Sequence, residues 1–252
     1  LHEEGHFAHD DAGVAAFSEY LAHHRRSNFR LLADVTDEGF QIETLPYTQG
    51  ADRSALLARK LGQYFYGSPL TTALSYGREK SGRRDEKFLC TALTRPPLFE
   101  PWLAALQAAE AQLAGIWSLP LIGAQLLARL PPARERCLLM SVTHGGIRQS
   151  FFENGRLIFS RLSWLAASGS AEIAAKIHQY LLGQRLIVRG TPLPVIILAH
   201  PAQSGSFLEQ CRSTEDMQFI LHDLHAACKA IGLKTLPQDS RSESLFLHLL
   251  VQ

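Results

Sequence analysis

The residues whose types and spacing best suit a chemical role are Thr143, His144, Gly145 and Gly146, which separate two apolar runs. Neighbouring glycines permit a tight turn whose backbone N–H groups point to one side, and such a concave set of donors binds anions. These residues are therefore a candidate phosphate-binding loop. The alternative is a plain hairpin turn, the structure that glycine-rich turns form most commonly.

A second run bounded by glycines, Gly77 to Arg84, has the spacing of a P-loop. It departs from that motif at Arg83 and Arg84, where a P-loop needs a Lys and a hydroxyl group for Mg²⁺. It also joins two predicted strands and opens no helix. We interpret it as a solvated hairpin tip. Because eight charged residues lie from Arg78 to Lys87, a protruding contact for a partner is the alternative.

The remaining chemical groups form no complete site. His222, His225 and Cys228 fall three apart on one predicted helix, but zinc needs a fourth ligand and no other part of the chain has ligand spacing. Ser204-Gly205-Ser206 lacks the glycine-flanked elbow of a hydrolase. The predicted strand 136–142 carries no carboxylate, so the two-metal chemistry of a nuclease is not expected. We predict no catalytic residue and no metal site.

Composition narrows the class of protein. The 252 residues carry a net charge of +1, with acids and bases interleaved, so no basic patch indicates a nucleic-acid partner. No apolar run approaches the ~20 residues of a membrane span. Widely spaced cysteines without a C-x-x-C pair are expected to be buried, inert thiols in a reducing compartment: Cys90, Cys137, Cys211 and Cys228.

The first half of the chain alternates predicted strands and helices. Because the sequence begins at Leu1, within an expected strand, we expect a fragment that lacks N-terminal strands. Asp10 and Asp11 can cap a helix that buries Leu21. Strands are expected at 1–9, 28–35, 40–47, 70–76 and 87–94, and further helices at 56–65 and from Pro101 through Ile116.

The best boundary signal is Pro131-Pro132, which is followed by charged residues. After it, Asn154-Gly155 predicts a tight hairpin. Strands are expected at 136–142, 147–152, 156–162, 194–199 and 245–251, with helices from Ser170 to Gly183 and, after a capping box at Ser213 and Asp216, from Met217 to Gly232. The order βββ-α-β-α-β is that of an RNase H-like lobe.

One segment of this half, Gly155-Arg156-Leu157-Ile158-Phe159-Ser160-Arg161, carries a family resemblance. It resembles the strand after the first hairpin of the second lobe in actin-like proteins, in particular the PilM-like proteins of type IV pilus assembly and their relatives in the type II secretion platform. Pro101 to Ala114, followed by Ser118-Leu119-Pro120, is similar to a helix of that family and its exit. The resemblance implies an α/β chain of two RNase H-like lobes, each a mixed sheet flanked by helices. Their expected limits are 1–132, with an inserted hairpin at 70–94, and 133–252.

The chain departs from that family at the phosphate motif. Counting back from Gly155, the family's Asp-x-Gly falls on Ser141-Val142-Thr143, so the carboxylate that would organise Mg²⁺ is missing. Our leading hypothesis is a non-catalytic, cytoplasmic scaffold or adaptor that binds a protein partner of the inner-membrane assembly machine and uses no cofactor. It would attach to the membrane through that partner or through a segment outside this sequence. The alternatives are an actin-like ATPase or sugar kinase that uses ATP and Mg²⁺, and an interaction domain unrelated to secretion.

Overall fold

The computed structural model describes all residues except 1–4, 26, 81, 131–133, 164–169, 189, 204–208, 210, 235 and 238–240. The chain divides into two compact units. The first consists of Leu1–Ala33, Asp37–Gly39 and Glu43–Trp117, and the second of Asp34–Thr36, Phe40–Ile42 and Ser118–Gln252. The predicted domain limits, 1–132 and 133–252, stay a prediction. By contacts, the main part of the second unit begins at Ser118.

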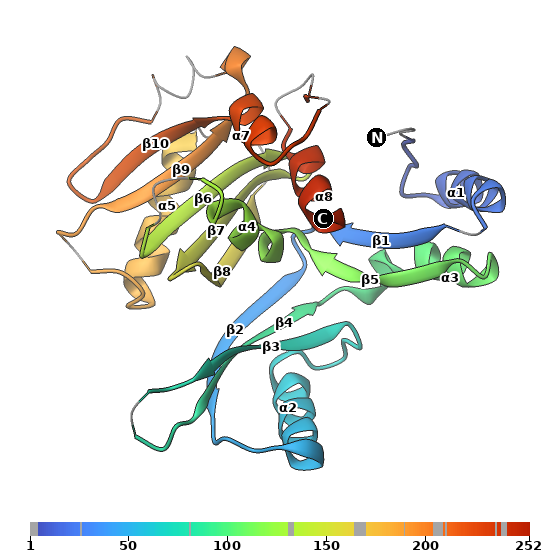
Figure 1. Cartoon of the computed structure of the whole chain (residues 1–252), viewed down its shortest axis with the longest axis horizontal. Helices are drawn as coiled ribbons and strands as arrows, with labels where there is room; N and C mark the ends of the chain where they lie inside the picture. The colour runs from blue at the N-terminus through green and yellow to red at the C-terminus, as the bar shows by residue number, and fades with distance from the viewer. Residues whose placement is uncertain are drawn as a thin grey trace. The chain divides into compact units, whose positions relative to one another are not determined.

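The first unit contains two small sheets, one of order β1-β5 and one of order β2-β4-β3 (Figure 1). The predicted hairpin at 70–94 is confirmed as β3 and β4, which pair antiparallel. Leu56, Leu57, Leu61 and Phe65 cover one face of this sheet, against Leu45, Phe88 and Cys90. The elements are α1 (Asp11–His23), β1 (Asn28–Ala33), β2 (Glu38–Leu45), α2 (Gly50–Tyr64), β3 (Thr71–Arg78), β4 (Glu86–Leu93), η1 (Pro96–Leu98), α3 (Glu100–Ala108) and β5 (Gln112–Ser118).

Two predictions for the first unit are wrong. Residues 5–9 form no strand, while residues 1–4 of that prediction lie outside the described residues. The helix expected to run through Ile116 ends at Ala108, and Ile116 lies on β5. Ala111 N donates to Leu106 O at 3.0 Å, which closes the helix in a Schellman turn. The left-handed residue of that turn is Glu110, with φ of 54°, so no glycine marks the stop.

The second unit is built on one five-stranded sheet of order β10-β9-β6-β7-β8. β6, β7 and β8 are antiparallel neighbours, while β9 and β10 run parallel to β6. As predicted, Asn154 and Gly155 form the β7–β8 turn, with φ of 52° and 71°. The elements are α4 (Leu119–Leu127), β6 (Arg136–Thr143), β7 (Gly146–Glu153), β8 (Arg156–Ser163), α5 (Ser170–Gly183), β9 (Leu193–Ala199), η2 (Pro201–Gln203), β10 (Met217–Asp223), α7 (Leu224–Ala230) and α8 (Glu243–Val251).

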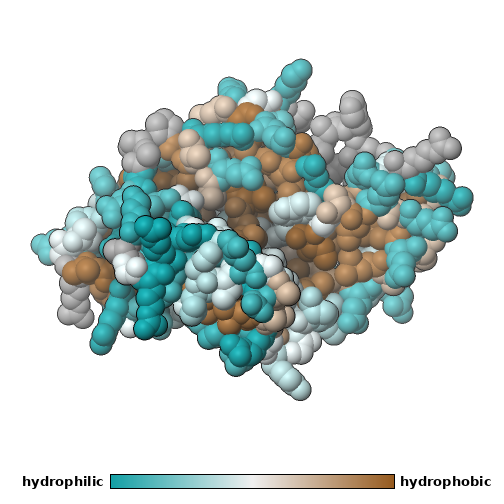
Figure 2. All heavy atoms as spheres, turned by 60° about the horizontal axis from the view of Figure 1, so that its bottom comes forward, coloured by the Kyte–Doolittle hydropathy of each residue, from teal (hydrophilic) through white to brown (hydrophobic). Residues whose placement is uncertain are grey.

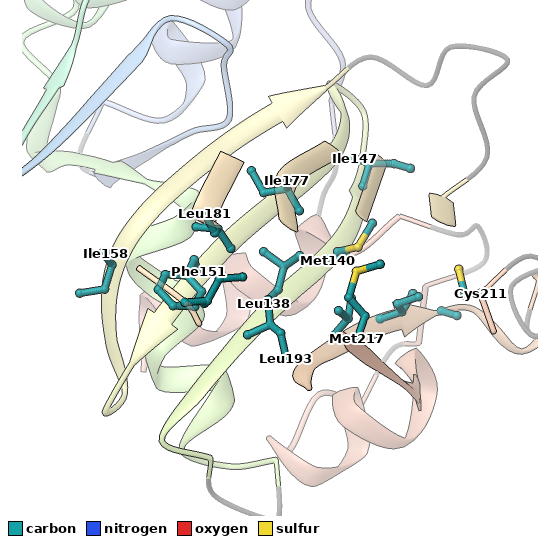
Figure 3. Close-up of a cluster of buried hydrophobic side chains, with 14 residues drawn as sticks. Leu138, Met140, Ile147, Phe151, Ile158, Ile177, Leu181, Leu193, Cys211 and Met217 are labelled. Carbon is teal, nitrogen blue, oxygen red and sulfur yellow. The ribbon is translucent and has the colours of Figure 1, made fainter. Parts of the chain in front are cut away.

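The core of this unit lies between the sheet and α5. Leu138 and Met140 of β6 point into the same cluster as Ile177 and Leu181 of α5 (Figure 3). The α4 helix contacts β7 and β8 and also packs against α8. The start of α8 is hydrogen-bonded to the end of β6, because Ser242 N donates to Val142 O at 2.9 Å, and the candidate loop follows that strand.

Two predictions for the second unit are also wrong. Met217 and Ile220, expected on a helix, lie on β10, and α7 begins only at Leu224. Ser213 Oγ instead accepts a hydrogen bond from Phe219 N at 3.0 Å, so the residue expected to cap a helix caps the edge of a strand. The expected last strand, 245–251, lies in α8. Its buried residues have helical spacing, namely Leu245, Phe246, Leu249 and Leu250.

Candidate functional site

The candidate loop is a short turn between β6 and β7. Thr143 ends β6 and pairs with Gly146, the first residue of β7, while His144 and Gly145 form the turn between them. Gly146 has φ of 129°, a conformation that favours glycine. The structure thus brings the predicted site residues together at one end of the sheet. Phosphate binding by them stays a prediction.

A carboxylate of the chain itself occupies the hydrogen-bonding face of this turn. Glu243 Oε1 accepts from the backbone N–H of His144 and from its Nδ1, the latter at 2.7 Å. Arg241 Nη1 lies 2.7 Å from His144 Nε2. Because a guanidinium can only donate, Nε2 is the acceptor, and the ring proton on Nδ1 points to Glu243. The turn therefore binds an anion, and that anion is Glu243.

Glu243 is held there by the start of α8. The preceding residue, Ser242, is wholly buried, and both its backbone N and its Oγ donate to Val142 O at 2.9 Å. These hydrogen bonds join the N-terminus of α8 to the last residues of β6. Sequence reasoning missed Glu243 because it predicted a strand at 245–251, and a strand there has no N-terminal carboxylate to place.

A buried cation lies beside Ser141, the position at which the sequence resemblance leads one to expect an Asp. Ser141 pairs with Arg148 across β6 and β7. The Arg148 side chain is only 2% exposed, and its Nε and Nη2 donate to Asp34 Oδ1 at 2.9 and 2.6 Å. Nη2 also donates to Val35 O at 2.9 Å. A charged residue within the apolar strand 147–152 was the available sequence signal for this pair, although its partner could not be inferred.

Packing explains why the turn contains a glycine at position 145. A Cβ added to Gly145 would lie 2.7 Å from Leu162 Cδ2 and 3.5 Å from Asp34 O and Oδ2. Real Cβ atoms do not approach other atoms to 2.7 Å, so any larger residue would displace Leu162. The contact with Leu162 therefore accounts for this glycine without a bound phosphate, whereas the Asp34 atoms lie at an ordinary van der Waals distance.

The other candidates form no site. Gly77 to Arg84 joins β3 to β4, so the hairpin prediction for it is confirmed. His222 lies on β10 whereas His225 and Cys228 lie on α7, which corrects the prediction that one helix carries all three. Burial lowers the pKa of His222, and Arg134 lowers it further.

Ser204-Gly205-Ser206 lies outside the described residues. Elsewhere in the described ranges, no group of three or more His, Cys, Asp or Glu side chains could hold a metal ion.

The thiols agree with the sequence prediction. Cys90, Cys137, Cys211 and Cys228 are all buried and form no disulfide. Burial raises the pKa of each thiol, to about 11 for Cys137 and Cys228. They are poor nucleophiles at neutral pH, because the reactive form is the thiolate.

Comparison with known proteins shows which solved structures have a similar fold. No family model matches the sequence, and no curated protein matches it. Among solved structures, the chain is similar to the PilM-PilN type IV pilus biogenesis complex, with a TM-score of 0.62 and 10% identity over 95% of this chain and 85% of that one. A Bacteroides thetaiotaomicron protein of actin-like ATPase fold and unknown function gives a TM-score of 0.38 and 13% identity over 82% and 76% of the two chains.

The TM-score of 0.62 shows that the protein shares the fold of the PilM-PilN structure, in agreement with the mixed α/β, actin-like fold that the resemblance in its sequence implied. More particularly, its structure is similar to that of the pilus biogenesis complex. Every helix in the described ranges is too short or too polar to cross a lipid bilayer.

Proposed function

We propose that this chain is a non-catalytic scaffold or adaptor of a pilus-assembly machine or of the inner-membrane platform of type II secretion. It acts in the cytoplasm by binding protein partners, one of which holds it at the inner membrane. The similarity to a pilus biogenesis complex supports the setting. The observation that carries the non-catalytic role is the β6–β7 turn, whose N–H is bonded to Glu243.

Two features of this turn oppose nucleotide chemistry. A phosphate that bound the N–H of His144 would first have to displace the Glu243 carboxylate, and any carboxylate left nearby would repel it. Mg²⁺ prefers carboxylate oxygens, but position 141 offers a hydroxyl group. The adjacent carboxylate of Asp34 is already bonded to the Arg148 guanidinium. Among the described residues, the anion position of the turn is therefore occupied by Glu243, and Asp34 is not available to hold the metal.

Thermal unfolding with ATP and Mg²⁺ tests this proposal. A ligand at 100 times its dissociation constant adds roughly 2.7 kcal/mol to the free energy of unfolding. We expect no upward shift of the melting temperature and no hydrolysis above background. The triple variant Ser141→Asp, Thr143→Gly and Glu243→Gln should regain weak ATP binding. Glu172→Gln, which removes an exposed carboxylate on α5, is the control. A clear stabilisation of the wild-type chain by ATP would favour the ATPase or kinase alternative.

Copurification from a membrane extract tests the adaptor role. The tagged chain should retain a component of a pilus or secretion platform, and added ATP should not release it. Ser141→Ala, which alters the position of the missing metal-binding carboxylate without adding charge, should leave this retention unchanged. Recovery of an activity that modifies a metabolite, with no platform component bound, would contradict the proposal.

A further inference from the structure

The outer edge of β3 presents an ordered row of backbone groups. β3 is the last strand in the order β2-β4-β3. Leu93 N donates to Leu70 O at 3.0 Å, which makes Leu70 and Leu93 a hydrogen-bonded pair of the antiparallel ladder. Such pairs alternate along a ladder, so Thr72 and Leu74 direct their N–H and C=O groups toward β4. Thr71, Ala73 and Ser75 direct theirs outward.

In the described part of the chain, no other strand pairs with this edge. The β10 edge of the five-stranded sheet differs, because residues of its own chain bond to it. On β10, Phe219 N donates to Ser213 Oγ at 3.0 Å, and Met217 N donates to Thr214 Oγ1 at 3.1 Å. Open edges are sites for pairing with another chain, and proteins commonly protect those that they do not use.

The open part of the β3 edge has a defined end. The register with β4 shifts between Ser75 and Gly77, so Tyr76 is a bulge. Gly77 N donates to Ser75 Oγ at 3.1 Å, which satisfies the first donor beyond the regular ladder. The segment Thr71–Ser75 therefore remains for pairing, which suits a short extended peptide rather than a whole sheet.

Positive charge lies at that end. The Arg78 guanidinium carbon lies 3.2 Å from the centroid of the Tyr47 ring. A hollow of about 450 Å³ opens there, lined by Arg53 and Glu86 as well as by Arg78 and Tyr47. Arg53 is bonded to Glu86, at 2.7 Å. Stacking orients the Arg78 guanidinium and leaves its edge N–H groups suitable for a carboxylate.

The hairpin beyond Arg78 adds to this charge. From Arg78 to Lys87 the sequence has five basic and three acidic residues. Figure 2 shows hydrophilic side chains gathered over the tip of this hairpin. Since one acid, Glu86, is already paired with Arg53, a segment that lies along β3 toward the tip meets mainly positive charge.

We infer that β3 accepts an extended, acidic segment of a protein partner as an added strand. The backbone of that segment pairs with Thr71, Ala73 and Ser75, and one of its carboxylates binds Arg78. Main-chain hydrogen bonds supply affinity in this mode, while the flanking side chains supply specificity. The inference rests on the proposed adaptor function for the kind of partner, but its test needs no native partner.

Proline substitutions test the edge, because proline removes a backbone N–H and is tolerated on edge strands. In Ala73→Pro and Thr71→Pro the lost N–H points away from β4, so both variants should keep the circular dichroism and melting temperature of the wild type. Arg78→Glu tests the charge. Arg129→Glu makes the same change of charge at an exposed position on the second unit.

The probe is a display library of random peptides, about twelve residues long, selected on the full chain. We expect the selected peptides to carry acidic residues near one end and no proline within their central run. By fluorescence anisotropy, the dissociation constant of the best peptide should rise about tenfold or more in either proline variant and in Arg78→Glu. It should not change in Arg129→Glu.

Four outcomes would overturn the inference. Selected peptides without acidic residues would show that Arg78 and the hairpin do not select the occupant. Binding that neither proline variant weakens would show that the edge is not the site. A wild-type dimer that Ala73→Pro dissociates would mean that a second copy of this chain pairs with the edge. Copurification from the membrane extract distinguishes the adaptor proposal from this inference. If Ala73→Pro retains a platform component as well as the wild type does, the adaptor role is supported, but pairing of the partner with β3 is contradicted.

Discussion

Arg148 on β7 and Asp34, 114 positions earlier in the chain, form an ion pair in which Nε and Nη2 donate to one carboxylate oxygen. The Arg148 side chain is 2% exposed and that of Asp34 is 14% exposed. A guanidinium in such surroundings is stable only while its partners remain, because water cannot replace them. The pair therefore fastens the segment Asp34–Thr36 to the five-stranded sheet of the second unit.

Removal of one member of this pair should lower the free energy of unfolding substantially. We expect Asp34→Ala to lower the free energy of unfolding by about 3–5 kcal/mol, since it leaves a buried guanidinium without its carboxylate. The double variant Asp34→Ala with Arg148→Met should recover most of that loss. Urea unfolding followed by circular dichroism measures both values. A loss below about 1 kcal/mol in Asp34→Ala would mean that water solvates Arg148 in the folded chain.

Gly145 offers a test of packing in the candidate loop. The methyl group of Gly145→Ala would meet Leu162 Cδ2 at 2.7 Å, so we expect a loss of about 1–3 kcal/mol in the free energy of unfolding. The same substitution in a Leu162→Ala background should cost less, because the clashing atom is absent. Equal costs in the two backgrounds would show that Leu162 is not the residue that limits the side chain at position 145.

The unfolding free energy should depend on pH through Glu86. A hydrogen bond from Arg53 is the main cause that holds the pKa of Glu86 below its ordinary value of 4.5. A carboxyl group with a lowered pKa in the folded state stabilises the fold above its unfolded pKa, and that contribution is lost as the pH falls. Stability should therefore decline below about pH 4.5.

The control for this pH dependence is a matched pair of variants. Glu86→Gln should flatten the decline in the acid range, whereas Glu79→Gln, at an exposed position of the same hairpin, should leave it unchanged. Urea titrations across the acid range measure the slope. Identical slopes in Glu86→Gln and the wild type would assign the decline to other carboxylates.

The four thiols should react only after unfolding. Burial raises the pKa of every one of them, and each is at most 8% exposed. At neutral pH, a disulfide reagent such as dithionitrobenzoate should release little colour from the native chain. In guanidinium chloride the full complement of Cys90, Cys137, Cys211 and Cys228 should react. Rapid labelling of Cys137 in the native state would show that the region around it opens readily.

The sequence by itself determined the features that depend on a few adjacent residues. Asp10 caps α1 by accepting from Gly13 N at 2.8 Å, and Asn154-Gly155 turns β7 into β8, both as predicted. Gly232 follows the end of α7, and its backbone N donates to Lys229 O at 3.0 Å. In each case the preferred backbone conformation of one or two residues is enough to specify the local structure.

Tertiary structure decided the elements whose local signals were ambiguous. Met217 to Asp223 could form a helix or a strand by periodicity, and pairing with β9 makes it a strand. The Glu110 turn that ends α3 has no glycine, so no short-range preference marks it. The candidate loop was likewise visible in the sequence, but the bonds of His144 to Glu243 and of Arg148 to Asp34 span 99 and 114 residues. Such partners meet only when packing brings distant segments together, because a local backbone preference contains no information about which remote side chain will arrive.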